Sequence, residues 1–121
     1  RILVVDDDQT LLGVLKAFLA FAGHDVMAAQ DGIVALEIVR SSALDLVISD
    51  IRMAPMNGIE LLRHVKEFNG KLPVIMLTAY ASRKTAEESK GLGAYAYLAK
   101  PFTNDELREV VTSALADNAR S

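Results

Sequence analysis

Acidic, hydroxyl and basic side chains stand at the ends of short apolar runs in this sequence. Asp6 and Asp7 follow one run, Asp50 a second, Thr78 a third and Lys100 a fourth. Carboxylates alone repel a phosphate, but they hold Mg2+ or Mn2+, which takes oxygen ligands together with a phosphate. A lysine adds a fixed positive charge, and a threonine hydroxyl can donate to a phosphoryl oxygen. These residue types predict metal-assisted phosphoryl transfer, in which an aspartate carboxylate attacks phosphorus and becomes an aspartyl phosphate.

The apolar runs alternate with segments of helical period, so the elements that position these residues can be predicted. The expected strands are Ile2–Val5, Val26–Ala29, Leu46–Ser49, Val74–Leu77 and Tyr95–Ala99. Five such β-α units predict an α/β fold, a single five-stranded parallel sheet that is doubly wound as (βα)5. Ligands of such sheets bind outside the carboxyl ends of the strands. If the first and third strands are neighbours, Asp6, Asp7 and Asp50 converge there.

Helix signals separate structural from functional polar residues. Asp8, directly before a leucine-rich segment, is expected to be a helix N-cap. Asn57 and Glu60 have the spacing of a capping box. The segment Ser82–Lys90 offers only Ala86 as an apolar side chain. We therefore expect a weakly held helix there, and weakly held elements are the ones available to move.

Length and composition limit the class of protein. With 121 residues, the chain is expected to form one domain over residues 1–116, followed by a terminus or linker at 117–121 leading to an output domain outside this sequence. The net charge of −3 and the lack of a dense Lys/Arg run argue against direct nucleic-acid binding. No apolar stretch approaches the roughly 18 residues of a membrane span, and there is no cysteine, so we expect a cytoplasmic protein without membrane contact. Because the sequence begins at Arg1 without Met, we suspect a fragment of a longer chain.

Four stretches, VVDDD, LVISDIRM, MLTA and YLAKPF, resemble in order the motifs of response-regulator receiver domains, the phosphoacceptor domains of two-component signal transduction. The resemblance covers essentially the whole chain and implies the flavodoxin-like strand order 2-1-3-4-5. It implies that Asp50 is the phosphoacceptor. Asp7 and Asp50 then bind Mg2+ directly with the backbone carbonyl of Arg52, and Asp6 acts largely through water. Lys100 pairs with the acceptor and later with the phosphoryl group.

The same resemblance implies a switch. Thr78 and Tyr97 match two switch residues: the threonine hydroxyl moves toward the phosphoryl oxygen, the aromatic ring turns inward, and the fourth helix repacks. The signal then reaches the face formed by the fourth helix, the fifth strand and the fifth helix. Arg52 and Tyr80 match positions that tune dephosphorylation. A bulky Tyr80 that obstructs the hydrolytic water predicts a long-lived phosphoryl state.

Two proline positions relate differently to the family pattern. Lys100-Pro101 matches a peptide bond that is cis in the family, where it directs the lysine side chain inward. Ala54-Pro55 stands where the family usually has Pro-Gly. The spacing from Asp50 to Asn57 is unchanged, so this departure affects the expected shape of the loop and not the expected chemistry.

A receiver domain would accept a phosphoryl group from the phosphohistidine of a sensor histidine kinase or of a phosphotransfer protein. It would not be an enzyme beyond catalysing its own phosphoryl transfer and autodephosphorylation. Association as a homodimer through the face of the fourth helix, fifth strand and fifth helix is an open option. So is a receiver-like module that works through protein contacts without phosphorylation.

A different class of protein must also be weighed. Asp6, Asp8 and Thr10 spell D-x-D-x-T, the first motif of haloacid dehalogenase-like phosphatases. That interpretation leaves Asp50 without a role, and no later strand ends in the paired acids that such phosphatases need. A flavodoxin-like cofactor binder is weaker still, because the first β-α turn would cradle phosphate and is acidic here.

Overall fold

Five parallel strands form one sheet in the computed structural model, which describes the backbone of residues 1–120. The strands are β1 (Ile2–Val5), β2 (Val26–Ala29), β3 (Leu46–Asp50), β4 (Val74–Thr78) and β5 (Ala96–Ala99). Their order across the sheet is β2-β1-β3-β4-β5, and every neighbouring pair is parallel. The predicted doubly wound α/β fold and its strand order are confirmed.

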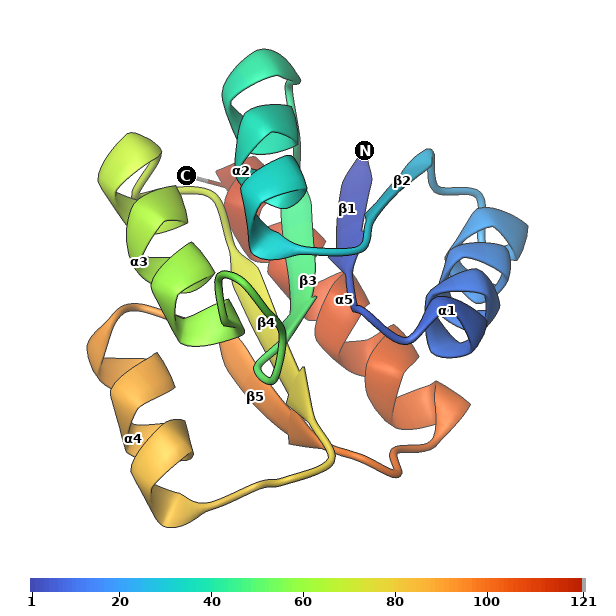
Figure 1. Ribbon diagram of the computed structural model, residues 1–121. Helices are drawn as coiled ribbons and strands as arrows, with labels where there is room; N and C mark the ends of the chain where they lie inside the picture. Colours follow the sequence, from blue (N-terminus) through green and yellow to red (C-terminus); the bar gives the residue numbers. More distant parts are fainter. Residues whose placement is uncertain (121) are drawn as a thin grey trace.

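Helices cover both faces of the sheet, as Figure 1 shows. One face carries α2, α3 and α4, and the other carries α1 and α5. The helices are α1 (Gln9–Phe21), α2 (Gly32–Ser41), α3 (Gly58–Phe68), α4 (Arg83–Gly91) and α5 (Asn104–Arg120). Among the described residues, no helix is both long enough and apolar enough to cross a membrane.

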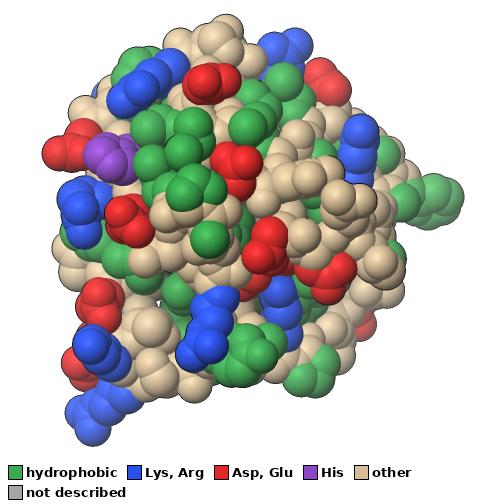
Figure 2. Space-filling model, in the orientation of Figure 1, with side chains coloured by type: hydrophobic (Ala, Val, Ile, Leu, Met, Phe, Trp, Pro, Cys, Tyr) green, Lys and Arg blue, Asp and Glu red, His purple; other side chains and the backbone are tan. Residues whose placement is uncertain are grey.

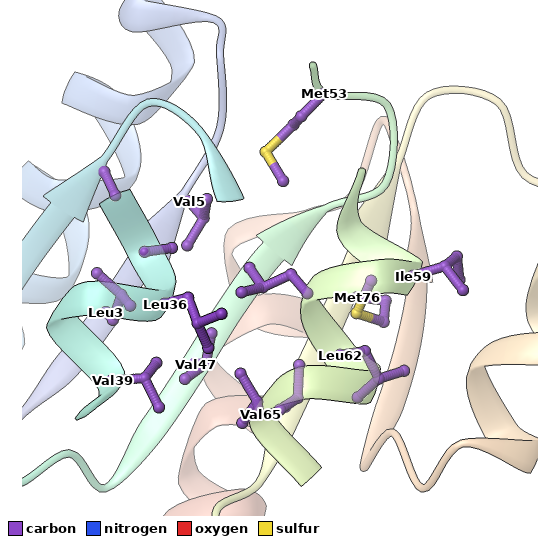
Figure 3. Packing of buried hydrophobic residues seen from close by; sticks show 14 of the residues in the cluster. Leu3, Val5, Leu36, Val39, Val47, Met53, Ile59, Leu62, Val65 and Met76 are labelled. Atoms are coloured by element: carbon purple, nitrogen blue, oxygen red, sulfur yellow. The ribbon is translucent and has the colours of Figure 1, made fainter. Parts of the chain in front are cut away.

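The core consists of two apolar clusters, one on each face. Successive side chains of a strand point to opposite faces, so Leu3 and Val5 pack under α2 and α3 (Figure 3), whereas Ile2 and Val4 pack under α1 and α5. All four side chains are buried. A central strand with two buried faces reads as a continuous apolar run, which is why β1 could be recognised before its neighbours were known.

Three strand boundaries differ by one residue from the prediction. Pairing continues to Asp50, which stands opposite Leu77, and to Thr78, which stands opposite Ala99. Asp50 and Thr78 are therefore the last residues of β3 and β4, where the sequence placed them just beyond. β5 begins at Ala96, one residue later than expected. The apolar pattern ends one residue before the strand pairing does in β3 and β4. The last paired residue of each strand can be polar because it borders a polar site.

The helix starts follow the capping signals. Asp8 is the N-cap of α1, and its carboxylate accepts hydrogen bonds from the amides of Thr10 and Leu11. Asn57 and Glu60 form a complete capping box at the start of α3. These caps hold the first turns of two helices that begin beside the carboxyl ends of the strands.

The fourth helix buries little apolar surface, as expected. Its N-cap is Ser82, and its buried residue is Ser89, whose hydroxyl has no hydrogen-bond partner among the described residues. At the C-terminus, α5 continues to Arg120, so its end lies beyond the expected boundary after residue 116. The division of the chain at 116 stays a prediction, and Ser121 lies outside the described residues.

Candidate functional site

Three aspartates meet at the carboxyl ends of β1 and β3. One carboxylate oxygen from each of Asp6, Asp7 and Asp50 lies within 4.8 Å of the others. Asp6 is 1% exposed and Asp50 is 8% exposed, whereas Asp7 is exposed to solvent. The pairing of β1 with β3 brings these residues together from positions more than 40 residues apart. In Figure 2, acidic and basic side chains lie beside one another over this end of the sheet.

A lysine reaches the aspartates from the end of β5. Lys100 Nζ donates to Asp6 Oδ2 at 3.1 Å and lies 3.7 Å from Asp50 Oδ1. Its backbone amide is held by the carbonyl of Thr78 at 2.7 Å, and the following bond to Pro101 is cis. The expected pairing with Asp50 is therefore shared, and the shorter contact is with Asp6. A sequence motif does not show whether the lysine lies closer to Asp6 or to Asp50, because this depends on the conformation of its side chain.

The surroundings of Asp50 combine burial with opposing charges. Burial raises the pKa of Asp50, the neighbouring Asp6 and Asp7 act in the same direction, and Lys100 and the amide of Ile51 oppose them. The Ile51 amide donates to Asp50 Oδ1 at 2.8 Å. A cluster of three acids, two of them buried, with one ammonium group suits a divalent cation, because a cation removes the repulsion among the carboxylates.

The donor set fits Mg2+ or Mn2+. Asp6, Asp7 and Asp50 supply only oxygen ligands, which these ions prefer over nitrogen and sulfur. Asp6 Oδ1 also accepts the amide of Asp8 at 2.9 Å, which fixes the direction of that carboxylate. Arg52, the expected backbone-carbonyl ligand, lies two residues after Asp50 in the loop that joins β3 to α3.

The two expected switch residues lie on neighbouring strands with different surroundings. Thr78 is buried, and its Oγ1 accepts the amide of Tyr80 at 3.0 Å. Tyr97 is half-buried and packs against the apolar cluster under α2 and α3. Its hydroxyl lies 2.6 Å from Thr85 Oγ1 and accepts the amide of Ser82 at 3.2 Å. Thr85 and Ser82 were not singled out from the sequence, because nothing in a polar helix start shows which strand residue it meets.

The two positions expected to tune dephosphorylation contact each other. The guanidinium carbon of Arg52 lies 4.0 Å from the centroid of the Tyr80 ring, which is a cation–π contact. Tyr80 is 62% exposed, so this contact lies at the surface. The two residues extend from the loops after β3 and β4, which are adjacent strands.

A glycine fixes the loop that follows Asp50. A Cβ atom on Gly58 would lie 2.0 Å from the carbonyl oxygen of Asp50, so only glycine fits. The Gly58 amide donates to the carbonyl of Ile51 at 2.8 Å and closes the loop. Both Ala54-Pro55 and Lys100-Pro101 are cis, and only the second was expected. The dipeptide Asn57-Gly58 was the available sequence signal for this close approach, a cap followed by a residue without a side chain.

The arrangement does not support the D-x-D-x-T interpretation. Asp8 is exposed and caps α1, and it does not belong to the acidic cluster that the structure describes. Thr10 lies within the first turn of α1. The acid that completes the cluster is Asp50, from a different strand.

Comparison with known proteins agrees with the geometry. Residues 2–112 match the family described as the response regulator receiver domain. The transcriptional regulatory protein ZraR of Klebsiella oxytoca is 48% identical over 115 residues, which are 95% of this chain and 26% of that protein. The sporulation initiation phosphotransferase F of Bacillus subtilis is 37% identical over 115 residues, 95% of this chain and 93% of that protein.

Solved structures show the same fold. A response regulator receiver domain protein (CheY-like) from Methanospirillum hungatei superimposes with a TM-score of 0.96 at 32% identity, covering 99% of this chain and 96% of that one. The chain spans about a quarter of the length of the ZraR proteins it matches. With the family match over most of its length, the chain belongs to the response-regulator receiver domains of two-component systems.

Proposed function

We propose that this domain is a phosphorylation-activated switch in which Asp50 accepts a phosphoryl group from a phosphohistidine. The observation that carries the proposal is the position of Asp50, a buried carboxylate between two further acids and 3.7 Å from the ammonium group of Lys100. An acid in this position has a pKa raised by burial and a cation ready to stabilise added negative charge.

Asp6, Asp7 and Asp50, with the backbone carbonyl of Arg52, would hold Mg2+ or Mn2+. When bound, the ion neutralises carboxylate charge and polarises the phosphoryl oxygens. Among the described contacts, Asp50 Oδ1 takes the Ile51 amide, which leaves Oδ2 to attack phosphorus. The new bond joins this oxygen to phosphorus, while the bond from phosphorus to the histidine nitrogen breaks and the imidazole leaves with a proton. Lys100 stays beside the acceptor and binds the added phosphoryl oxygens.

The switch begins when Thr78 changes partners. Its hydroxyl, which now accepts the Tyr80 amide, turns toward a phosphoryl oxygen on Asp50. The β4–α4 connection then moves, Tyr97 turns inward and α4 repacks, so the change reaches the surface formed by α4, β5 and α5. The small amount of apolar surface that α4 buries supports this role. A homodimer through that surface is one form that the output can take.

Arg52 and Tyr80 set the lifetime of the phosphoryl group. Their cation–π contact joins the loops that follow β3 and β4, the strands that end at Asp50 and Thr78. Water must approach phosphorus from the solvent side during hydrolysis, and the stacked pair obstructs this approach. We therefore expect a long-lived aspartyl phosphate.

The partner that delivers the phosphoryl group is a sensor histidine kinase or a phosphotransfer protein, and an apolar surface lies beside the site. Leu11, Val14 and Phe18 of α1 line an open groove together with Lys100. Lys100 belongs to both the groove and the acidic pocket, so a protein bound over α1 would lie beside Asp50. We expect the domain to act in the cytoplasm, with an output that is either a further domain of a longer chain or docking by the domain alone. The transcriptional regulators, of which this chain spans about a quarter, support the first output, and the sporulation initiation phosphotransferase F, of which it spans 93%, supports the second.

The test is incubation with Mg2+ and acetyl phosphate, followed by intact-mass measurement. We expect a gain of one phosphoryl group in the parent and in Asp8→Asn, and no gain in Asp50→Asn. A parent that gains no mass contradicts the proposal and favours a module that works through protein contacts alone. Steady hydrolysis of phosphate esters that is abolished by Asp6→Asn supports a phosphatase instead.

A further inference from the structure

Three side chains and one backbone segment form a closed ring of hydrogen bonds where α4 begins. The Ser82 amide donates to Tyr97 Oη at 3.2 Å, and Tyr97 Oη lies 2.6 Å from Thr85 Oγ1. Thr85 Oγ1 donates to the Ser82 carbonyl at 3.3 Å. The Ser82 hydroxyl, 3.0 Å from Thr85 Oγ1, accepts the Thr85 amide and caps the helix.

One assignment of the hydroxyl hydrogens satisfies the whole ring. Thr85 Oγ1 donates its single hydrogen to the Ser82 carbonyl, so the hydrogen between Tyr97 Oη and Thr85 Oγ1 comes from Tyr97. The Tyr97 hydroxyl also accepts from the Ser82 amide. The Ser82 amide, the Tyr97 hydroxyl and the Thr85 hydroxyl each donate once, and the Ser82 carbonyl accepts the last of these hydrogen bonds. Hydrogen bonds connected in this way strengthen one another. The position of Tyr97 therefore depends on a hydroxyl at position 85.

Little else holds this part of the fold. In α4, Ser89 is the buried residue, and its hydroxyl is unpartnered among the described residues. The Arg83–Glu87 ion pair is exposed on both sides, and pairs of this kind contribute little. In Figure 1, α4 stands at the outer edge of the domain, after the extended connection from β4. The ring is thus a main attachment of the start of α4 to β5.

The ring is also connected to the acidic site through a short piece of chain. Thr78 Oγ1 accepts the Tyr80 amide, and Ser82 follows two residues later with its amide on Tyr97. A Thr78 hydroxyl that turns toward a phosphoryl group releases Tyr80. The connection that carries Ser82 is then free to move, and the ring opens. The ring as observed therefore belongs to the state in which Thr78 faces its own loop.

We propose that Thr85 is a positioning residue for the switch: its hydroxyl latches Tyr97 to α4 in the unphosphorylated state. The proposal rests on the proposed function of Asp50 and adds a residue that holds the switch closed. An interaction present only in the resting state must be broken on activation. Its loss therefore raises the apparent affinity for a ligand that favours the active state.

The experiment measures binding of beryllium trifluoride, a phosphoryl mimic, in the presence of Mg2+. We compare the parent with Thr85→Val, Tyr97→Phe, the double variant and Thr85→Ser. Thr85→Val keeps the shape and removes both hydrogen-bonding roles, whereas Thr85→Ser keeps the hydroxyl. The matched control is Thr112→Val, since Thr112 is an exposed helical threonine on α5.

We expect Thr85→Val and Tyr97→Phe each to bind the mimic about two- to tenfold more tightly, the range that one net hydrogen bond represents. The double variant should gain no more than a single variant, because both substitutions open the same ring. Thr85→Ser and Thr112→Val should bind like the parent. Unchanged or weaker binding by Thr85→Val overturns the latch, and additive gains show that the two hydroxyls act separately.

A second measurement tests the latch without any phosphoryl mimic. In the metal-free protein, Tyr97→Phe removes the acceptor of the Ser82 amide, so amide hydrogen exchange at Ser82 should accelerate. Thr85→Val should accelerate it in the same direction, and Thr112→Val should not. Exchange at Ser82 that is equal in all variants contradicts the latch. A parent that fails to bind the mimic while exchange changes as expected contradicts the proposed phosphoryl switch and leaves the latch standing.

Discussion

Replacing Lys100 with methionine tests how the acidic pocket is held together. Lys100 Nζ lies 3.1 Å from Asp6 and 3.7 Å from Asp50, and both carboxylates are buried. At an effective dielectric constant of about 20, these contacts correspond to Coulomb attractions of about 5 and 4 kcal/mol. Burying the ammonium group offsets several kcal/mol of this sum, so the net cost of the substitution should be about 3–5 kcal/mol. Methionine keeps most of the length of the side chain, and the loss is therefore mainly one of charge.

The assay is urea denaturation at neutral pH without divalent cations, with Lys84→Met as the control at an exposed position. Mg2+ should stabilise Lys100→Met more than it stabilises the parent. In the variant the ion no longer competes with the ammonium group for the carboxylates, so it binds more tightly and adds more free energy of unfolding. The variant should nevertheless accept phosphoryl groups slowly, because no fixed cation faces the acceptor.

Two results would refute this reasoning. A Lys100→Met protein as stable as Lys84→Met without Mg2+ means that the ammonium group does not hold the acids together. Equal stabilisation of parent and variant by Mg2+ means that the lysine and the metal do not share the same carboxylates.

Further substitutions test the acceptor Asp50, the loop that follows it, the Arg52–Tyr80 pair and α4. Burial raises the pKa of Asp50 in the folded protein above the ordinary carboxyl value of the unfolded chain. At a pH between these two pKa values the folded state binds more protons than the unfolded state, so the protein loses stability as the pH rises through this range. Asp50→Asn should therefore be more stable than the parent at neutral pH without metal, and this difference should vanish in urea titrations at a pH below the ordinary value. Gly58→Ala should lose about 2 kcal/mol or more because its Cβ meets the Asp50 carbonyl, whereas Gly13→Ala, with nothing nearby, should be neutral or slightly stabilising. Tyr80→Ala should shorten the aspartyl phosphate half-life in a mass-based time course, and an unchanged half-life argues against shielding. Ser89→Ala removes a buried hydroxyl that has no hydrogen-bond partner in the described part of the chain, so the midpoint of thermal unfolding should rise by an amount equivalent to about 1 kcal/mol. A lower midpoint would reveal a partner for that hydroxyl.

The fold could be predicted because its signal is local and repeated. Buried parallel strands are short apolar runs, and each β-α unit restricts the next to a right-handed crossover. The convergence of Asp6, Asp7 and Asp50 follows from the same rule, since parallel strands end at one edge of the sheet. These inferences need only the direction of the chain.

Contacts between side chains of different strands, loops and helices could not be predicted in this way. The lysine lies closer to Asp6 than to Asp50, although its motif indicates the acceptor as its partner. The Arg52–Tyr80 stack joins two loops 28 positions apart, and the Tyr97–Thr85 contact crosses from a strand to a helix. Such pairs depend on rotamers and on a loop path that strand and helix periodicity do not specify. The same applies to the cis bond at Ala54-Pro55.

In the proposed switch, the magnitudes at its two ends explain how a phosphoryl group on Asp50 would move α4. A phosphoryl group brings a charge of about −1.5 to −2, and each contact with a cation in the pocket is worth several kcal/mol at these distances. The start of α4 is held by a ring of hydrogen bonds, which contributes on the order of 1–3 kcal/mol, and by little buried apolar surface. The chemical event is therefore larger than the attachment it must overcome. A helix with a full apolar face would reverse this relation, because each buried leucine adds about 2 kcal/mol to its anchorage. The polar sequence of α4 is thus a requirement of the proposed switch, because it keeps the free energy that attaches α4 below the interaction energy that one phosphoryl group supplies.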